Sequence, residues 1–217
     1  NENSASPLFR NKGEVHALAT TDSDGYVHWY HRYEPSDKLV LRGQLEYWSN
    51  EDIYKDFYYD SYKNRTAPRD FLNLTYRQDD YIATGTIRPN VHNWFNETER
   101  LPEGTFHLLE RQLVDRLYLS FDTVNGYNDR QQDGNSGGRT ANVLRLTYDW
   151  DPVEGLNIAP FWENQLNAYA ATDNSGESGV VASTTAGVTV QSRFQRTYGG
   201  VFGFSEFKHM VIPSITL

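Results

Sequence analysis

The chain has 217 residues, of which 38% are hydrophobic and 14% aromatic, and it carries a formal net charge of -9 with no cysteine. Without cysteine the sequence forms no disulfide, thiolate metal site or cysteine nucleophile, and the acidic balance argues against nucleic acid as a partner. No apolar run approaches the roughly 18 residues that a membrane-spanning helix needs, and the high aromatic content argues against disorder.

The first part of the chain predicts a run of β-strands. Residues 1–13 lack a clear pattern, and they have neither the basic n-region nor the apolar h-region of a signal peptide. We therefore interpret them as an N-terminal loop or linker. Alternation with a period of two then predicts strands over 14–21 and 26–34, joined by the turn signal at 22–25 (DSDG). The next strand, residues 38–49 (KLVLRGQLEYWS), has one largely apolar face and one largely polar face.

Alternation continues to the end of the sequence, with two polar loops expected at 128–140 and 173–179. Further strands are expected at 53–60, 71–78, 80–88, 105–114, 116–127, 141–150, 156–172 and 180–197, and in the closing segment 209–217. The sequence therefore predicts about a dozen strands, with short turns at one end and longer polar loops at the other, as in outer-membrane barrels.

This pattern predicts an all-β fold, an antiparallel up-and-down transmembrane β-barrel. A soluble sheet buries its apolar face, whereas a membrane barrel turns it toward lipid and keeps polar residues around a water-filled lumen. The long strands and unequal turns favour the barrel. We assign residues 14–217 to one outer-membrane barrel segment. Because two open sheet edges are costly in lipid, we expect a partial barrel, either a fragment of a longer protein or a shortened relative.

The residues that could carry chemistry do not form a recognisable site. His28 and His31 fall on opposite faces of one strand and cannot share a metal ion there. The segments DSDG and DNSGESG lack the rest of a calcium-loop pattern. Carboxylate pairs that could be imagined as a glycosidase dyad are Glu97/Glu99 and Asp149/Asp151. Sequence spacing does not show the separation of about 5–10 Å across a cleft that a dyad needs, so we assign no catalytic, cofactor-binding or metal residue and predict no enzyme.

Four tryptophans lie at or near predicted strand ends: Trp48, Trp94, Trp150 and Trp162. A tryptophan at a strand end suits the membrane interface, where its ring lies among the lipid headgroups. It equally suits a soluble core, and the sequence leaves this alternative open.

Residues 41–62 (LRGQLEYWSNEDIYKDFYYDSY) resemble the barrel region of the lipopolysaccharide-assembly outer-membrane protein family, LptD, also called organic solvent tolerance protein. That family has an arginine-glycine strand and then an acidic S-(D/N)-x-D-Y-x-x-D-F segment, which here covers residues 49–57. Later segments resemble family strands in the same order: 99–106 (ERLPEGTF), 192–199 (SRFQRTYG) and 207–217 (FKHMVIPSITL). The resemblance spans about residues 26–217.

The resemblance implies that Leu39, Leu41, Leu45 and Tyr47 face lipid while Arg42, Gln44 and Glu46 face the lumen. It also implies an outer-membrane translocon that inserts lipopolysaccharide into the outer leaflet through a polar lumen and a lateral strand seam, without a cofactor. The implied partners are lipopolysaccharide, an LptE-like plug lipoprotein, periplasmic bridge proteins and outer-membrane lipid. The family's periplasmic jellyroll and disulfide cysteines have no counterpart in this sequence. The alternatives are a soluble β-sandwich that binds or cleaves polysaccharide, and a passive porin.

Overall fold

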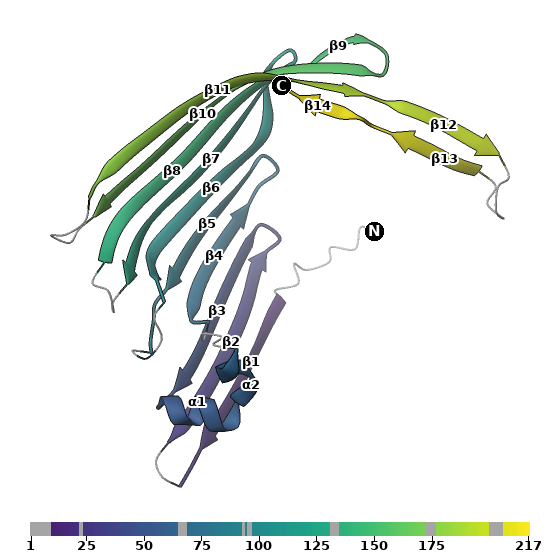
Figure 1. Ribbon diagram of the computed structural model, residues 1–217. Helices are drawn as coiled ribbons and strands as arrows, with labels where there is room; N and C mark the ends of the chain where they lie inside the picture. Colours follow the sequence, from purple (N-terminus) through teal and green to yellow (C-terminus); the bar gives the residue numbers. More distant parts are fainter. Residues whose placement is uncertain are drawn as a thin grey trace, which may run out of the picture.

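A computed structural model describes residues 10–21, 24–64, 69–92, 94, 97–130, 135–171, 177–199 and 206–217 (Figure 1). The described chain is almost entirely β. Its strands are β1 (Arg10–Ala19), β2 (Gly25–Ser36), β3 (Leu39–Trp48), β4 (Phe71–Arg77), β5 (Tyr81–Arg88), β6 (Glu99–Val114), β7 (Leu117–Arg130), β8 (Asn135–Tyr148), β9 (Trp150–Val153), β10 (Leu156–Ala171), β11 (Gly179–Ser192), β12 (Phe194–Gly199), β13 (Glu206–Val211) and β14 (Ser214–Thr216). Two short helices, α1 (Glu51–Phe57) and α2 (Tyr59–Lys63), follow β3.

The strands form one large antiparallel up-and-down sheet, as predicted. Each strand from β1 to β7 pairs with the next in the chain, and the order then continues from β8 through β10, β11 and β14. Strand β9 pairs only with β10, and β12 and β13 form a separate two-stranded sheet. The large sheet is curved and open, because its edge strands β1 and β14 do not pair with one another (Figure 1).

From β2 to β7 the two ends of the sheet differ in the length of their connections, as predicted. Beyond β8 the asymmetry is lost, because residues 149–155 with β9 and residues 193–213 with β12 and β13 connect strands at the end of the short turns. Two or three residues join β2 to β3, β4 to β5 and β6 to β7 at the upper end in Figure 1. At the lower end, residues 49–70 with both helices join β3 to β4, and residues 89–98 join β5 to β6. We call these the short-turn end and the long-loop end.

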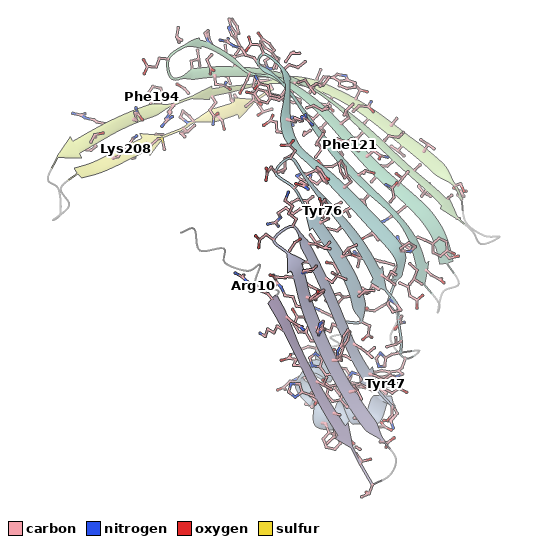
Figure 2. The ribbon with its side chains drawn as sticks, turned by 180° about the vertical axis from the view of Figure 1, so that it is seen from behind. Arg10, Tyr47, Tyr76, Phe121, Phe194 and Lys208 are labelled. Carbon is pink, nitrogen blue, oxygen red and sulfur yellow. The ribbon has the colours of Figure 1, made fainter. Side chains whose placement is uncertain are left out.

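The two faces of the sheet differ in chemistry. We define the leucine face by Leu39, Leu41, Leu45 and Tyr47 of β3, and the polar face by Arg42, Gln44, Glu46 and Trp48. Pairing places Leu41 opposite Tyr33 and Leu74, so the leucine face continues across β2 and β4. Tyr47, Tyr76 and Phe121, which are labelled in Figure 2, belong to this face by register.

Apolar side chains of the leucine face are exposed in this structure. Leu45 is 37% exposed, Leu72 53% and Leu74 44%. On the polar face, in contrast, Glu103 is only 7% exposed and Trp48 only 3%. The leucines therefore do not pack into a dry core, which is the opposite of what a soluble sheet with one solvated face would show.

A small aromatic core lies on the polar face at the long-loop end, where α1 and α2 cover the sheet. It is formed by Tyr26, Trp48, Ile53 and Tyr54, with Leu18, Tyr62 and Trp94 packed against it. The rings of Tyr26 and Trp48 lie 4.1 Å apart between centroids. Because α1 begins directly after β3, its Ile53 and Tyr54 fold back onto the end of the strand that precedes them.

The strand predicted over 53–60 is wrong, because this segment forms most of α1 and the start of α2. Asn50 caps α1, since its side-chain oxygen accepts a hydrogen bond from the Ile53 N–H at 3.0 Å. Glu51 and Asp52 in the first turn complement the positive end of the helix dipole. The sequence contains this capping signal, but the tyrosine-rich residues that follow it are typical of a strand and led to the wrong prediction. No helix in the described ranges is long and apolar enough to cross a membrane.

Other predicted boundaries shift. The loop predicted at 128–140 is mostly strand, because β7 and β8 stay paired as far as Arg130 and Asn135, and only 131–134 lie outside the described residues. Most of the loop predicted at 173–179 also lies outside them, as do Asp22 and Ser23 of the turn. Strand β1 begins at Arg10, earlier than predicted.

The last strands are interrupted where single strands were predicted. The strand expected over 180–197 breaks at Arg193, where β11 ends and β12 leaves the large sheet. The segment expected over 209–217 divides into β13 and β14 around Pro213, which has no N–H to donate to a ladder.

Candidate functional site

The polar face carries a row of three cationic residues across β1, β2 and β3. Pairing places Lys12 opposite Arg32, and Arg32 opposite Arg42. Arg32 forms an ion pair with Glu34 of its own strand. Like charges directly opposite one another destabilise a sheet, so this row is an electrostatic cost that a bound anion would offset.

A second charged group lies farther along the same face, on β6 and β8. The Glu103 carboxylate accepts hydrogen bonds from Arg100 at 3.0 Å and from Arg139 at 2.8 Å. The Glu103 side chain is only 8% exposed, while both arginines remain nearly half exposed. The arginines therefore shield a buried carboxylate and still present positive charge to the space above the face.

Polar contacts continue across β7, β8 and β10. Arg145 lies 3.4 Å from Glu163 and stacks its guanidinium 4.0 Å from the centre of the Phe161 ring. His107 of β6 pairs with Asp122 of β7. Cross-strand pairs of this kind hold the strands in register while leaving the face hydrophilic.

Three further polar residues of this face converge where β1 meets β2. Glu14, His16 and His28 each offer one ligand atom, and these atoms lie within 4.8 Å of one another. His31 lies on the leucine face, opposite Gly43, so the prediction that His28 and His31 are separated is confirmed. Sequence reasoning missed the cluster because spacing within one strand does not show which residues the neighbouring strand places opposite.

A buried polar pair, Asp70 and His92, closes the long-loop end. An Asp70 carboxylate oxygen accepts the Glu46 N–H at 2.6 Å, and the His92 Nε2 accepts the Trp48 N–H at 3.1 Å. Burial raises the pKa of Asp70 to about 6, opposed by the hydrogen bond from the Glu46 N–H. Burial lowers the pKa of His92. The pair ties the connections around β4 and β5 to the end of β3.

The four carboxylates considered from the sequence as glycosidase dyads each lie next to a hydrogen-bond donor. Glu97 lies 2.7 Å from Arg88, and Glu99 accepts the Asn90 N–H at 2.9 Å. Asp149 and Asp151 both accept hydrogen bonds from the Asn157 side chain, at 2.9 and 3.0 Å. These contacts bridge loops and strands.

Of the four tryptophans named from the sequence, two belong to or pack against the aromatic core and two are exposed. Trp48 is buried in the aromatic core, and Trp94 packs against that core. Trp150 is 47% exposed at the start of β9. Trp162, 38% exposed, lies within β10 opposite Leu146 of the leucine face.

Comparison with known proteins adds no relative: no protein-family model matches the sequence, and no curated protein matches it. What the fold and the site define is a class, an open antiparallel up-and-down sheet with an exposed apolar face and a hydrogen-bonded, ion-paired polar face.

Proposed function

We propose that this chain forms part of the wall of a bacterial outer-membrane β-barrel, with its leucine face against lipid and its polar face toward a water-filled lumen. The observation that carries the proposal is the inverted exposure of the two faces. Leu45 and Leu72 are exposed, while Glu103 of the opposite face is buried between Arg100 and Arg139. In lipid this arrangement is favourable, since acyl chains cover the leucines and water solvates the lumen.

Within such a barrel, we propose that the chain serves in lipopolysaccharide insertion. The motif resemblance over residues 26–217 supports this function, and so does the charge of the polar face. Lipopolysaccharide is a phosphorylated, anionic glycolipid, and the row of Lys12, Arg32 and Arg42 presents cations to the proposed lumen. An LptE-like plug and periplasmic bridge proteins are the partners that this function requires.

The proposed route needs no covalent chemistry. The sugars pass along the polar face, where water and hydrogen-bonding side chains replace bulk solvent. The acyl chains leave sideways between two weakly paired strands and so remain in hydrocarbon. This division follows from the high cost of moving either polar groups into lipid or acyl chains into water.

Adjacent residues on β3 give a matched test of the membrane orientation. Leu45→Arg places a charge on the leucine face, whereas Gln44→Arg places the same charge on the polar face. We expect Leu45→Arg to destabilise the folded chain in liposomes, lowering its free energy of unfolding by about 2–4 kcal/mol near the bilayer centre. Gln44→Arg should fold like the wild type. Urea titration and heat-modifiable gel mobility measure both.

Equal effects of the two variants would contradict the membrane orientation. So would a wild-type chain that stays monodisperse without detergent, the behaviour expected of a soluble polysaccharide-binding sheet.

Transport is tested separately by photo-crosslinking in cells. A photoreactive residue at position 42 or 44 faces the proposed lumen and should form adducts with lipopolysaccharide. A passive porin would fold into the membrane and give no adduct at any polar-face position. That outcome would retain the barrel and reject lipopolysaccharide transport.

A further inference from the structure

We propose that Glu14, His16 and His28 form a binding site for a divalent transition-metal ion such as Zn²⁺, Ni²⁺ or Cu²⁺. The site lies on the polar face where β1 pairs with β2, and it is independent of the proposed transport function. One carboxylate oxygen and two imidazole nitrogens lie within 4.8 Å of one another. Neither the motif resemblance nor any single-strand pattern indicates this site.

The strand register brings the three side chains together. His16 lies directly opposite His28 in the β1–β2 pairing, and their rings stack with centroids 6.0 Å apart and an interplanar angle of 19°. Glu14 precedes His16 by two residues and therefore projects from the same face. The backbone thus fixes all three ligands on one patch, and only side-chain rotation is needed to close them around an ion.

The donor set determines which ions fit. Zn²⁺ binds imidazole nitrogen and carboxylate oxygen at about 2.0–2.2 Å, and imidazole also suits Ni²⁺ and Cu²⁺. Glu14 and His16 are exposed at the edge strand, so their side chains can move toward His28 without repacking a core. In the described part of the chain, neither the Glu14 side chain nor the His16 side chain hydrogen-bonds to another residue, so metal binding competes with no such contact.

A second carboxylate lies close to His28, on β3. The Glu46 carboxylate lies 3.9 Å from the Nε2 of His28, on the strand that follows β2 in the sheet. Rotation of the Glu46 side chain toward the ion would add this carboxylate as a fourth ligand, from a third consecutive strand. Such an ion would tie the edge strand β1 to its neighbours, and because it binds the folded sheet it would raise stability by mass action.

Another histidine contact on the same face shows what the cluster adds. His107 pairs with Asp122 on β6 and β7, but this pair offers only one imidazole and one carboxylate. His31 lies on β2 like His28 but faces the other side of the sheet. Only the β1–β2 patch combines two imidazoles with a carboxylate among the described residues.

The test is metal binding by the full chain folded in detergent. Zn²⁺, Ni²⁺ and Cu²⁺ are each titrated by calorimetry, with Ca²⁺ as a hard-ion comparison. We expect one transition-metal ion per chain and no comparable Ca²⁺ binding, because imidazole disfavours Ca²⁺. His16→Ala and His28→Ala should each weaken binding at least about 100-fold. His31→Ala is the matched control and should bind like the wild type.

Two readouts separate loss of a ligand from loss of folding. Glu14→Gln keeps the size and strand position of the side chain and should weaken binding about tenfold or more. Bound Co²⁺ should show the visible absorption of nitrogen and oxygen coordination, and His28→Ala should abolish it while gel mobility stays that of a folded chain.

Three results would overturn the proposal. One is the absence of transition-metal binding by the wild type at millimolar ion. A second is unchanged stoichiometry and affinity in folded His16→Ala and His28→Ala. The third is an equal loss of binding in the His31→Ala control, which would place the ion elsewhere.

Discussion

The Asp70 carboxylate lies 3.8 Å from the His92 imidazole, measured from Oδ2 to Nδ1, and both side chains are at least 96% buried. The β3–β4 pairing ends at Gln44 and Phe71, so the later N–H groups of β3 along this edge need other acceptors. Asp70 and His92 supply them to Glu46 and Trp48. The connections that carry Asp70 and His92 thereby complete the hydrogen bonding of β3, which extends beyond its pairing with β4.

Titration of Asp70 should make the chain less stable as the pH rises from about 4 to about 6. Burial raises the pKa of Asp70 from 3.8 to about 6, so the folded state binds this proton more tightly than the unfolded state. The contribution of protonated Asp70 to the free energy of unfolding is complete below the pKa of the unfolded state. About 2–3 kcal/mol of it is lost as the pH rises through the pKa of the folded state. Urea midpoints at successive pH values measure the slope.

The matched variants for this pH dependence are Asp70→Asn and His92→Gln. Asp70→Asn keeps an oxygen that accepts the Glu46 N–H and should abolish the decline. The pKa of His92 is lowered by burial, so its contribution has the opposite sign and is lost as the pH falls below 6.5. His92→Gln should therefore keep the Asp70 decline. The same pH slope in the wild type and in Asp70→Asn would contradict the assignment.

The aromatic core should depend on one short helix. Ile53 is 4% exposed, and Ile53→Ala should lower the stability of the α1–α2 segment by about 2–5 kcal/mol. Asn50→Ala removes the cap and should cost about 1 kcal/mol, whereas Asn50→Ser keeps a capping oxygen and should recover most of it. Hydrogen exchange of amides 51–63 measures the local stability. Unchanged protection in Ile53→Ala would show that the helices are held by other contacts.

Much of the sheet could be predicted from the sequence because side-chain alternation is a local property. Residues 38–49 predict β3 and assign its two faces, and the unequal connections predict the two ends. Helix α1 could not be predicted in the same way, since it depends on the contact of Tyr54 with Trp48 as well as on its cap. The cluster of His16 and His28 depends on register, which alternation within one strand does not fix.

The paired ends of β7 and β8 also escaped prediction. Their glycine- and asparagine-rich sequence is typical of a loop, yet the register continues from Asp129 opposite Ser136 to Arg130 opposite Asn135. Backbone hydrogen bonding sustains these strand ends where the side chains provide no apolar signal. Sequence patterning detects the alternation of apolar and polar side chains, and residues 128–138 show no such alternation.

Adjacent glycines in β8 should respond differently to alanine. A Cβ on Gly137 would lie 2.6 Å from the Ala170 carbonyl oxygen, whereas a Cβ on Gly138 meets nothing within 4 Å. Gly137→Ala must therefore push β8 and β10 apart and should cost about 1–3 kcal/mol. Gly138→Ala should be neutral or slightly stabilising, because it lowers the entropy of the unfolded chain. Equal urea midpoints for the two variants would contradict this close approach.

Two ion pairs should show whether the polar face meets water. Glu103 is nearly buried between Arg100 and Arg139, whereas Arg88 and Glu97 are each about one-third exposed. A double-mutant cycle with Glu103→Gln and Arg139→Met should give a coupling above about 1 kcal/mol that changes little with salt. The cycle with Arg88→Met and Glu97→Gln should give less than about 1 kcal/mol and should fall as salt is raised, because water and ions screen an exposed pair. A salt-independent Arg88–Glu97 coupling would mean that this part of the face is dry, which contradicts a water-filled lumen.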